Sequence, residues 1–306
     1  MKIMVFDVGG TEIKYSVMDE QMHRTNSGAV PTPQDTQAQF LDAVYRLYAP
    51  HKDEVSGIAM ALPGFVDNRT GYVSNGGALL YNTATPVGQL LAEKCGCPVI
   101  LENDGKAAAM AELANGALKD CCNAAVFIIG TGVGGGIIAN GQLVRGVHFT
   151  AGEYSFVNTN AEAWDAPDQN MACQCSTSNL LKWYRARKAL PEDAPLDGRS
   201  FFAAANAGEP EALEVLRRFC HAVAVQIYNL TVLLDVEKVA IGGGISQQPL
   251  LLESLRSAYD GLYASRAGQA YMEGLPRCQI VPCAFSSEAN QVGVAAAYFE
   301  AMQKKC

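Results

Sequence analysis

The sequence of 306 residues is poor in charge and in aromatic rings, with 18% charged and 8% aromatic residues. It has no segment with the roughly 20 uninterrupted apolar residues that a membrane-spanning helix requires. It also lacks a basic run dense enough to follow the phosphates of a nucleic acid, and its net charge of −8 disfavours nucleic acids and anionic membranes as partners. These absences leave small metabolites as the expected ligands.

The start of the sequence lacks the features of an export signal. Residues 1–6, MKIMVF, have the pattern of an apolar strand, without the charged region, long apolar stretch and cleavage site of a signal peptide. We therefore expect a cytoplasmic protein, in which most of the ten cysteines are reduced thiols rather than parts of a disulfide scaffold. We interpret adjacent Cys121 and Cys122 as a core residue and its surface neighbour, with a redox pair as the alternative.

An alternation of strand-like and helix-like segments runs through the whole chain. Strand patterns occur at residues 2–8, 13–18, 55–61, 99–101, 124–129, 137–139 and 239–241. Helical spacing of apolar residues predicts helices over residues 36–48, 105–118, 179–190, 209–235 and 288–303. The second half repeats the order of the first, since each half begins with two strands joined across a glycine-rich turn.

This repeat predicts an α/β fold made of two similar domains with a central cleft. We expect a smaller N-terminal domain of residues 1–118, completed by a C-terminal helix at about 288–306, and a larger domain of residues 119–287. The apolar helix at 209–235 is expected either in the core or against a second subunit, and we expect a homodimer.

Three glycine-rich turns, each at the end of a strand, predict a site for the phosphates of a nucleotide. In the first, Asp7-Val8-Gly9-Gly10-Thr11-Glu12-Ile13-Lys14, the glycines would let backbone N–H groups approach phosphoryl oxygens, and Asp7 would hold a water on Mg²⁺. The second is the run 130–136, and the third is IGGGIS at 241–246, between a strand and a helix. A plain β-turn is the alternative for any single one, but three together favour a nucleotide.

The segment Glu102-Asn103-Asp104 carries the candidate catalytic base. Phosphoryl transfer needs a carboxylate that accepts the proton of the attacking hydroxyl, and Asp104 is our candidate. Asn103 can both donate a hydrogen bond to a sugar hydroxyl and accept one from it. The alternative is that Asn103 or Asp104 caps the helix that follows, which would account for only one of the three residues.

These motifs, in this order, resemble the motif set of the ROK family, which comprises sugar kinases and sugar-responsive repressors. The matching segments cover nearly the whole chain: 7–14, 61–64, 102–104, 130–136, 152–153 and 241–246. The resemblance implies the duplicated, ribonuclease H-like fold of the actin/hexokinase ATPases, with ATP and Mg²⁺ as cofactors. The repressors carry an additional N-terminal winged helix-turn-helix, and this sequence begins at the phosphate motif, so the kinase branch is expected.

The resemblance also implies roles for particular residues. Asp104 would be the catalytic base, and Gly64, Asn103 and Glu153 would contact the sugar. The ATP site would be lined by Asp7, Gly9, Gly10, Thr11, Lys14, Thr131, Gly132 and Gly243.

The sequence departs from the family pattern where many members bind a structural Zn²⁺. In those members Gly-Glu is followed by x-Gly-His and then by C-x-C-G-x-x-G-C-x-E, but here Phe156 stands at the His position and Leu180 at the third cysteine. Only Cys173 and Cys175 match, fewer than the four ligands of a closed zinc site. We therefore expect no structural zinc, and we interpret nearby His148 as an exposed loop residue.

The same departures from the family pattern affect the expected choice of sugar substrate. In the family, that His and the Glu after the last cysteine help to hold the hydroxyls near C1 and C2, whereas here these positions are Phe156 and Lys182. An aromatic ring suits an apolar sugar face or an aglycone, so we expect phosphorylation by ATP at the C6 hydroxyl of glucose or of a β-glucoside such as cellobiose. The alternative for Phe156 is that it fills core space left by the missing metal.

Other functions stay open at this point. The alternative sugars are fructose, allose and N-acetylmannosamine. A non-catalytic sugar sensor would use the same cleft to regulate a partner, and a structural or chaperone-like ATPase would hydrolyse ATP without any sugar.

Overall fold

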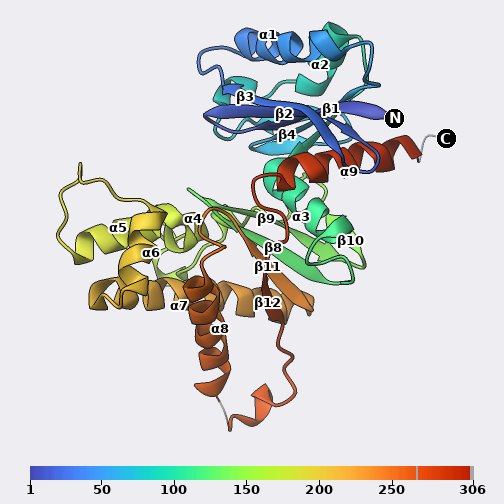
Figure 1. The fold of residues 1–306 in the computed structure, drawn as a ribbon. Coiled ribbons are helices and arrows are strands. Elements are labelled where there is room, and N and C mark those ends of the chain that lie inside the picture. Colours follow the sequence, from blue (N-terminus) through green and yellow to red (C-terminus); the bar gives the residue numbers. More distant parts are fainter. Residues whose placement is uncertain (267, 304–306) are drawn as a thin grey trace. The chain divides into compact units, whose positions relative to one another are not determined.

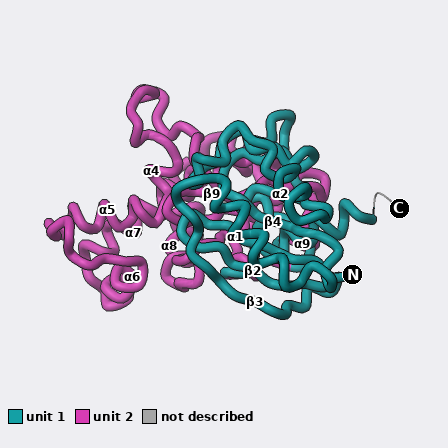
Figure 2. Tube along the Cα trace, turned by 90° about the horizontal axis from the view of Figure 1, so that it is seen from above, with its two compact units in different colours: residues 1–115, 143–151, 287–306 teal, residues 116–142, 152–286 magenta. Residues whose placement is uncertain are grey.

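The computed structural model describes residues 1–266 and 268–303, which form two compact units (Figures 1 and 2). The first unit contains residues 1–115, 143–151 and the C-terminal segment from 287, and the second contains residues 116–142 and 152–286. The domain boundaries expected from the sequence, 118/119 and 287/288, stay a prediction. Unlike that division, the structure groups residues 143–151 with the first unit.

Five strands in the order β3-β2-β1-β4-β7 form the main sheet of the first unit. β1 (Lys2–Val8) pairs antiparallel with β2 (Glu12–Asp19), which pairs antiparallel with β3 (Arg24–Pro31). On the other side of β1, β4 (Ile58–Leu62) and then β7 (Val99–Asn103) run parallel to it. The carboxyl ends of β1, β4 and β7 therefore lie at one edge of the sheet, where ligands bind in open α/β sheets.

Helices cover both faces of this sheet (Figure 1). One face is covered by α1 (Gln37–Tyr48) and α2 (Val87–Cys95), and the other by α3 (Asp104–Asn115) and α9 (Ala289–Gln303). In α1, apolar residues at a spacing of four residues face the core, and Thr36 caps the first turn by accepting a hydrogen bond from the Gln39 backbone N–H. The amphipathic spacing in the sequence thus predicted this helix correctly.

Small residues allow α3 and α9 to pack closely. A Cβ atom on Gly293 of α9 would lie 1.7 Å from the carbonyl oxygen of Ala107 in α3, so only glycine fits at this crossing. Four of the five alanines of α3 are buried (Ala107, Ala108, Ala109 and Ala111), which explains an Ala-rich helix with little amphipathic contrast.

Shorter elements complete the first unit. β5 (Phe65–Asp67) and β6 (Tyr72–Asn75) form a separate two-stranded sheet, and η1 (Ala49–His51) and η2 (Leu80–Asn82) are single 3₁₀ turns. The sequence patterns did not indicate β3, β5, β6 or α2.

The second unit repeats the sheet of the first. Its order is β10-β9-β8-β11-β12, with the bounds β8 (Ala124–Ile129), β9 (Val133–Ala139), β10 (Gln142–Val144), β11 (Lys238–Gly242) and β12 (Gln279–Pro282). As in the first unit, the opening hairpin β8–β9 is antiparallel, and β11 and β12 follow in parallel on the far side of β8. The duplicated α/β architecture predicted from the sequence is confirmed.

The second glycine run is mostly strand rather than loop. β9 begins at Val133, so only residues 130–132 form the turn, and the expectation that the whole run 130–136 is a phosphate-binding loop is wrong for Gly134–Gly136. Gly135 has φ +146°, and a Cβ atom there would lie 1.9 Å from the Val126 carbonyl oxygen. Glycine is therefore required at position 135 because β8 packs closely against β9.

Helices of the second unit pack around one apolar core. Their bounds are α4 (Met171–Cys175), α5 (Thr177–Arg187), α6 (Gly198–Asn206), α7 (Pro210–Leu234) and α8 (Pro249–Ala264). Single 3₁₀ turns are η3 (Tyr154–Phe156), η4 (Ala161–Ala163) and η5 (Ala270–Met272). The predicted helices at 179–190 and 209–235 correspond to α5 and α7. None of the described helices has the length and apolar character needed to cross a membrane.

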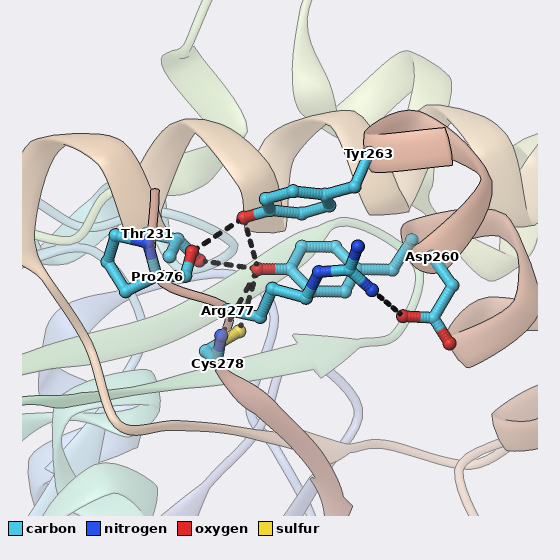
Figure 3. A network of polar contacts seen from close by, with 7 residues as sticks. Thr231, Asp260, Tyr263, Pro276, Arg277 and Cys278 are labelled. Carbon is cyan, nitrogen blue, oxygen red and sulfur yellow. Dashed lines mark hydrogen bonds and ion pairs between the residues drawn. The ribbon is translucent and has the colours of Figure 1, made fainter. Parts of the chain in front are cut away.

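A network of buried polar groups joins α7, α8 and the start of β12 (Figure 3). The Tyr259 hydroxyl lies 3.0 Å from Thr231 Oγ1 and 3.1 Å from the Tyr263 hydroxyl, and it accepts a hydrogen bond from the Cys278 backbone N–H at 3.2 Å. The Arg277 guanidinium lies over the Tyr263 ring, 4.4 Å from its centroid. Burial raises the pKa of Tyr259, so this phenol stays neutral and acts as a structural link.

The structure separates the adjacent cysteines as expected: Cys121 is buried and Cys122 is exposed.

Candidate functional site

The first glycine turn joins β1 to β2 and is held from one side by residues 32–34. The Thr32 hydroxyl donates to the Gly9 carbonyl at 2.8 Å, the Thr32 backbone N–H donates to the Thr11 carbonyl at 3.0 Å, and the Gln34 amide donates to the Gly10 carbonyl at 2.7 Å. These carbonyl oxygens would repel a phosphate, but each is already engaged within the protein. The turn is otherwise largely exposed, which suits an anion-binding role for its backbone.

Asp7 lies directly before this turn and is only 9% exposed. Its Oδ1 accepts a hydrogen bond from Asn290 Nδ2 at 2.9 Å, and Lys14 is its partner in the β1–β2 register. Burial raises the pKa of Asp7, and the Asn290 hydrogen bond and the Lys14 charge oppose this effect.

The surroundings of Asp7 fit Mg²⁺ held through water. Within residues 1–266 and 268–303, no three His, Cys, Asp or Glu side chains come together as a metal-binding group. A single carboxylate is nevertheless a common protein contribution to Mg²⁺, which keeps several waters and takes other ligands from substrate phosphates.

Asn103 links the end of β7 to the β4–β5 turn. Its Nδ2 donates to the Gly64 carbonyl at 2.9 Å, and its Oδ1 accepts from the Lys106 backbone N–H at 3.0 Å. The second bond is a helix N-cap, so capping of α3 by Asn103, one of the alternatives from the sequence, is confirmed. By count, a side-chain amide can still make one further bond as donor and one as acceptor.

Gly64 is fixed by its backbone. It has φ +93°, and a Cβ atom there would lie 2.1 Å from the Asn75 carbonyl oxygen. Any other residue would displace this turn and with it the carbonyl that Asn103 contacts.

Asp104 is the first residue of α3 and is half-buried. Its Oδ1 accepts a hydrogen bond from the Gly105 backbone N–H at 2.7 Å, which restricts the direction of the carboxylate. The positive end of the α3 dipole lies at the same place and favours a negative charge there. These features suit a proton acceptor with a fixed orientation.

In the second unit, the β8–β9 turn is closed by backbone and side-chain hydrogen bonds. The Gly130 N–H donates to the Gly132 carbonyl at 3.0 Å, and Ser155 Oγ both donates to the Val133 carbonyl and accepts from the Val133 N–H. Thr131 therefore stands at the tip of a rigid turn.

A cavity of about 470 Å³ adjoins this turn, within the size range of small-molecule sites. It also reaches the first residues of α5 and α6, and helix N-termini favour anions. The polar and glycine residues in its wall, among them one carboxylate and one guanidinium, are Gly130, Thr131, Thr177, Ser178, Asp197, Gly198, Arg199, Gly244 and Gln248.

Gly243, the predicted ATP-site residue of the third glycine turn, lies beside Gly244 in the chain. It has φ +100°, and a Cβ atom there would lie 2.1 Å from the Ile129 carbonyl oxygen. The close approach of the β11 end to the β8 end explains this glycine.

The predicted sugar-contact residues of the second unit lie at the two ends of η3. Glu153 is half-buried just before this turn, and Phe156 at its end is 70% exposed. The alternative that Phe156 fills core space is therefore wrong. The ring that is buried is that of Tyr154, which stacks on Phe127 at a centroid distance of 4.5 Å.

The segment that binds zinc in many family members is part of the apolar core here. Leu180 and Cys175 are fully buried, and burial raises the pKa of the Cys175 thiol to about 12. A zinc ligand must be a thiolate, so this environment opposes metal binding. Cys173 Sγ instead lies 3.7 Å from the Pro167 carbonyl oxygen, and His148 is exposed.

Two sets of predicted residues thus emerge, each described within its own unit. The first unit carries Asp7, Gly9, Gly10, Thr11, Lys14, Gly64, Asn103 and Asp104, and the second carries Thr131, Gly132, Glu153, Phe156 and Gly243. Sequence reasoning missed their supporting partners Thr32, Gln34, Asn290, Thr177 and Arg199.

Comparison with known proteins identifies the family of the chain. A family profile described as ROK family matches residues 3–303. The chain belongs to the ROK family. A β-glucoside kinase of Listeria innocua is 31% identical over 84% of this chain and 87% of its own length.

Solved structures of the family share the fold. A ROK family protein of Streptococcus pneumoniae in complex with sucrose has a TM-score of 0.86 and 28% identity, covering 99% of this chain and 100% of its own. A ROK family glucokinase of Streptomyces griseus in complex with glucose and AMPPNP has a TM-score of 0.80 and 25% identity, covering 97% and 99%. The actin/hexokinase-like fold class predicted from the sequence is confirmed.

The buried carboxylate of Asp7 predicts a pH-dependent effect of Asp7→Asn on stability. The pKa of Asp7 in the folded protein is raised above 3.8, its value in the unfolded chain, so the fold favours the protonated carboxyl group. The stability that this provides is fully present below the unfolded pKa and is lost as the pH rises through the folded pKa. A tenfold change in the proton affinity of one group corresponds to about 1.4 kcal/mol. Asp7→Asn, which keeps an acceptor for Asn290, should therefore raise the free energy of unfolding at about pH 7.5, and the gain should shrink towards about pH 4.5.

Urea unfolding at both pH values measures this gain. Asp19→Asn is the control of opposite sign, because hydrogen bonds from the His23 and Gln21 backbone lower the pKa of Asp19. An Asp7→Asn variant that loses stability at neutral pH would contradict the assignment of burial as the dominant effect.

Proposed function

We propose that the protein is an ATP-dependent sugar kinase that transfers the γ-phosphate of ATP to the C6 hydroxyl of glucose or of a β-glucoside. The observation that carries this proposal is the Asp104 carboxylate, held in one direction at the N-terminus of α3 beside the Asn103–Gly64 contact. The nucleotide-sized cavity at Thr131 and relatives named β-glucoside kinase and glucokinase support it.

In the proposed reaction, Asp104 accepts the proton of the sugar hydroxyl as that oxygen attacks the γ-phosphorus and ADP leaves. Asn103 and Gly64 keep the helix that carries Asp104 in register with the turn after β4, and Glu153 binds sugar hydroxyls. The backbone of the glycine turns contacts the phosphates. Mg²⁺, held through water by Asp7, would offset phosphate charge.

Two other classes of function lead to different behaviour. A sugar sensor binds the sugar but does not turn ATP over, and a chaperone-like ATPase turns ATP over without sugar. Sugar-dependent release of ADP therefore separates the kinase from both. The oriented carboxylate of Asp104 favours the kinase, because a sensor would not require a proton acceptor there.

Asp104→Asn tests the proposed base. The amide keeps the size of the side chain but cannot accept the proton, so we expect sugar-dependent turnover to fall by about 10²- to 10⁴-fold, while the dissociation constant for ATP changes by less than about twofold. A coupled ADP-release assay and calorimetric titration measure the two quantities. Asp42→Asn, on α1 of the same unit, is the matched control; turnover retained in Asp104→Asn would remove Asp104 from this role.

We propose further that the acceptor sugar is substituted at C1. The exposed Phe156 ring replaces a His that would hold a free anomeric hydroxyl, and an aromatic face stabilises an apolar sugar surface. The β-glucoside kinases among the relatives, and the neighbour with bound sucrose, a sugar without a free anomeric hydroxyl, support this choice.

Phe156→Ala tests the sugar preference. Loss of the ring should raise the KM for cellobiose by about three- to tenfold and leave the KM for glucose within about twofold. Steady-state kinetics over a panel of free and C1-substituted sugars, including N-acetylmannosamine, fructose and allose, gives both values. If the unchanged protein strongly prefers free glucose, the glycoside proposal is discarded and the kinase proposal stays.

We also propose a homodimer formed through the C-terminal end of α7. Leu233 is 77% exposed there, Val232 and Val157 are also exposed, and a cavity of about 320 Å³ lies among them. A cluster of exposed apolar residues favours a protein partner, and a second copy is the commonest one.

Leu233→Asp should convert this dimer to a monomer, because it places a charge in the apolar contact. Sedimentation equilibrium measures the molar mass, for which one chain contributes 32.6 kDa. Leu80→Asp is the control, since Leu80 is 71% exposed on η2 of the other unit. A monomeric unchanged protein would contradict the proposal.

A further inference from the structure

Glu102, the residue before Asn103-Asp104, places a carboxyl group in the interior of the first unit. Its side chain is 0% exposed. Arg145 donates to Glu102 Oε2 from Nε at 2.9 Å and contacts it with Nη2 at 2.8 Å. The other oxygen, Oε1, accepts a hydrogen bond from the Asn103 backbone N–H at 3.1 Å. Both carboxylate oxygens are thus held, one by a guanidinium and one by the backbone that leads to Asp104.

Arg145 opposes the effect of burial on this carboxyl group. Burial raises the pKa of Glu102, and the charge and hydrogen bonds of Arg145 are the main influences that lower it. A buried carboxylate without its partner is strongly unfavourable, so the two side chains depend on each other.

Arg145 belongs to a loop that joins the first unit although the chain on both sides of it belongs to the second. The loop is closed by a hydrogen bond from the Ala151 N–H to the Arg145 carbonyl at 3.2 Å. Its buried Phe149, at φ +60°, is covered by the Arg69 guanidinium, 4.6 Å from the ring centroid. A bulky residue at positive φ costs free energy and persists only where the surroundings hold it. The chain then continues directly into Gly152-Glu153.

We propose that Arg145 is a positioning residue for the phosphoryl transfer, acting through Glu102 on the Asn103-Asp104 backbone. The inference rests on the proposed kinase function, which supplies the role of Asp104. The same contact anchors the loop that begins at Arg145 to the end of β7 within the first unit.

A role in stability alone explains these contacts less well. Desolvation of a buried ion pair offsets much of its attraction, and an apolar pair of similar volume is often as stable. An apolar pair, however, would not supply directional hydrogen bonds on both carboxylate oxygens. Since the bond on Oε1 comes from the backbone N–H of Asn103 and the bonds on Oε2 come from Arg145, loss of Arg145 would free the Glu102 side chain and let the Asp104 carboxylate deviate from its direction.

Three variants separate positioning from stability. Arg145→Met removes the charge and leaves Glu102 unpaired, Arg145→Lys keeps the charge but not the planar fork, and the double variant Glu102→Gln with Arg145→Met removes both charges. Lys94→Met, which breaks the exposed pair with Asp42 in the same unit, is the matched control. For each variant the unfolding midpoint, kcat, and the KM values for ATP and sugar are measured.

Positioning predicts that stability and turnover respond differently. We expect kcat to fall by about 30- to 100-fold in Arg145→Met, with a smaller loss in Arg145→Lys and a KM for ATP within about threefold of the unchanged protein. The double variant should regain most of the unfolding midpoint but not kcat. If kcat recovers together with the midpoint, the pair is only structural and the proposal is overturned.

A readout without turnover keeps this inference separate from the kinase proposal. Hydrogen exchange of the backbone around residues 102–106 and 143–151 should quicken in the double variant, and exchange in α1 should not change. Unchanged exchange at 102–106 would overturn the positioning role even if the protein phosphorylates no sugar. Conversely, if exchange quickens but the protein shows no sugar-dependent turnover, the kinase proposal is contradicted and the positioning of the Asp104 backbone by Arg145 is not.

Discussion

The candidate site of the first unit depends on one constraint, the parallel register of β1, β4 and β7. Asp7 pairs with Ala61, and Ala61 pairs with Glu102, so three strands end at one level of the sheet. After each of these strands the backbone turns within one or two residues. The groups that meet at this edge are therefore the glycine turn after β1, Gly64 after β4, and Asn103-Asp104 at the end of β7. Fully buried strands behind them hold this edge rigid.

The second unit has the same parallel register at the carboxyl ends of its own strands. β8 and β11 also run in parallel register, and their carboxyl ends approach so closely that Gly243 meets the Ile129 carbonyl. Where the first unit places carboxylates, the second places a cavity bordered by the N-termini of α5 and α6. Each copy of the sheet thus brings its candidate site residues to the carboxyl ends of its parallel strands.

The sequence predicted the elements with strong periodicity and the order of the glycine turns, because both signals are local. It did not predict β3, whose residues Arg24–Pro31 are mostly exposed and lack alternation. It also missed Thr32, Asn290 and Arg145, since each acts on a site residue distant in the chain. Gly135 shows the opposite error. It lies within an apparent phosphate-binding loop, but strand packing requires it, and composition alone cannot distinguish a glycine needed for phosphate binding from one needed for packing.

Apolar burial and helix caps hold the segment that contains Cys173 and Cys175. With Leu180 and Cys175 in the core, apolar burial and the caps at Asn170 and Ser176 hold the segment that metal bonds would otherwise hold. The replacement is imperfect, because Asn179 Nδ2 is buried without a hydrogen-bond partner among the described residues, at a cost of about 1–3 kcal/mol.

The η3 turn then decides which ring is exposed. Tyr154 points inward, where its ring stacks on Phe127 and its hydroxyl donates to the Gly136 carbonyl at 3.2 Å. In a 3₁₀ turn successive side chains diverge by about a third of a turn, so Phe156, two residues later, cannot share that direction. The burial of Tyr154 therefore directs residue 156 away from the core, and the loop sequence supplies the aromatic ring there.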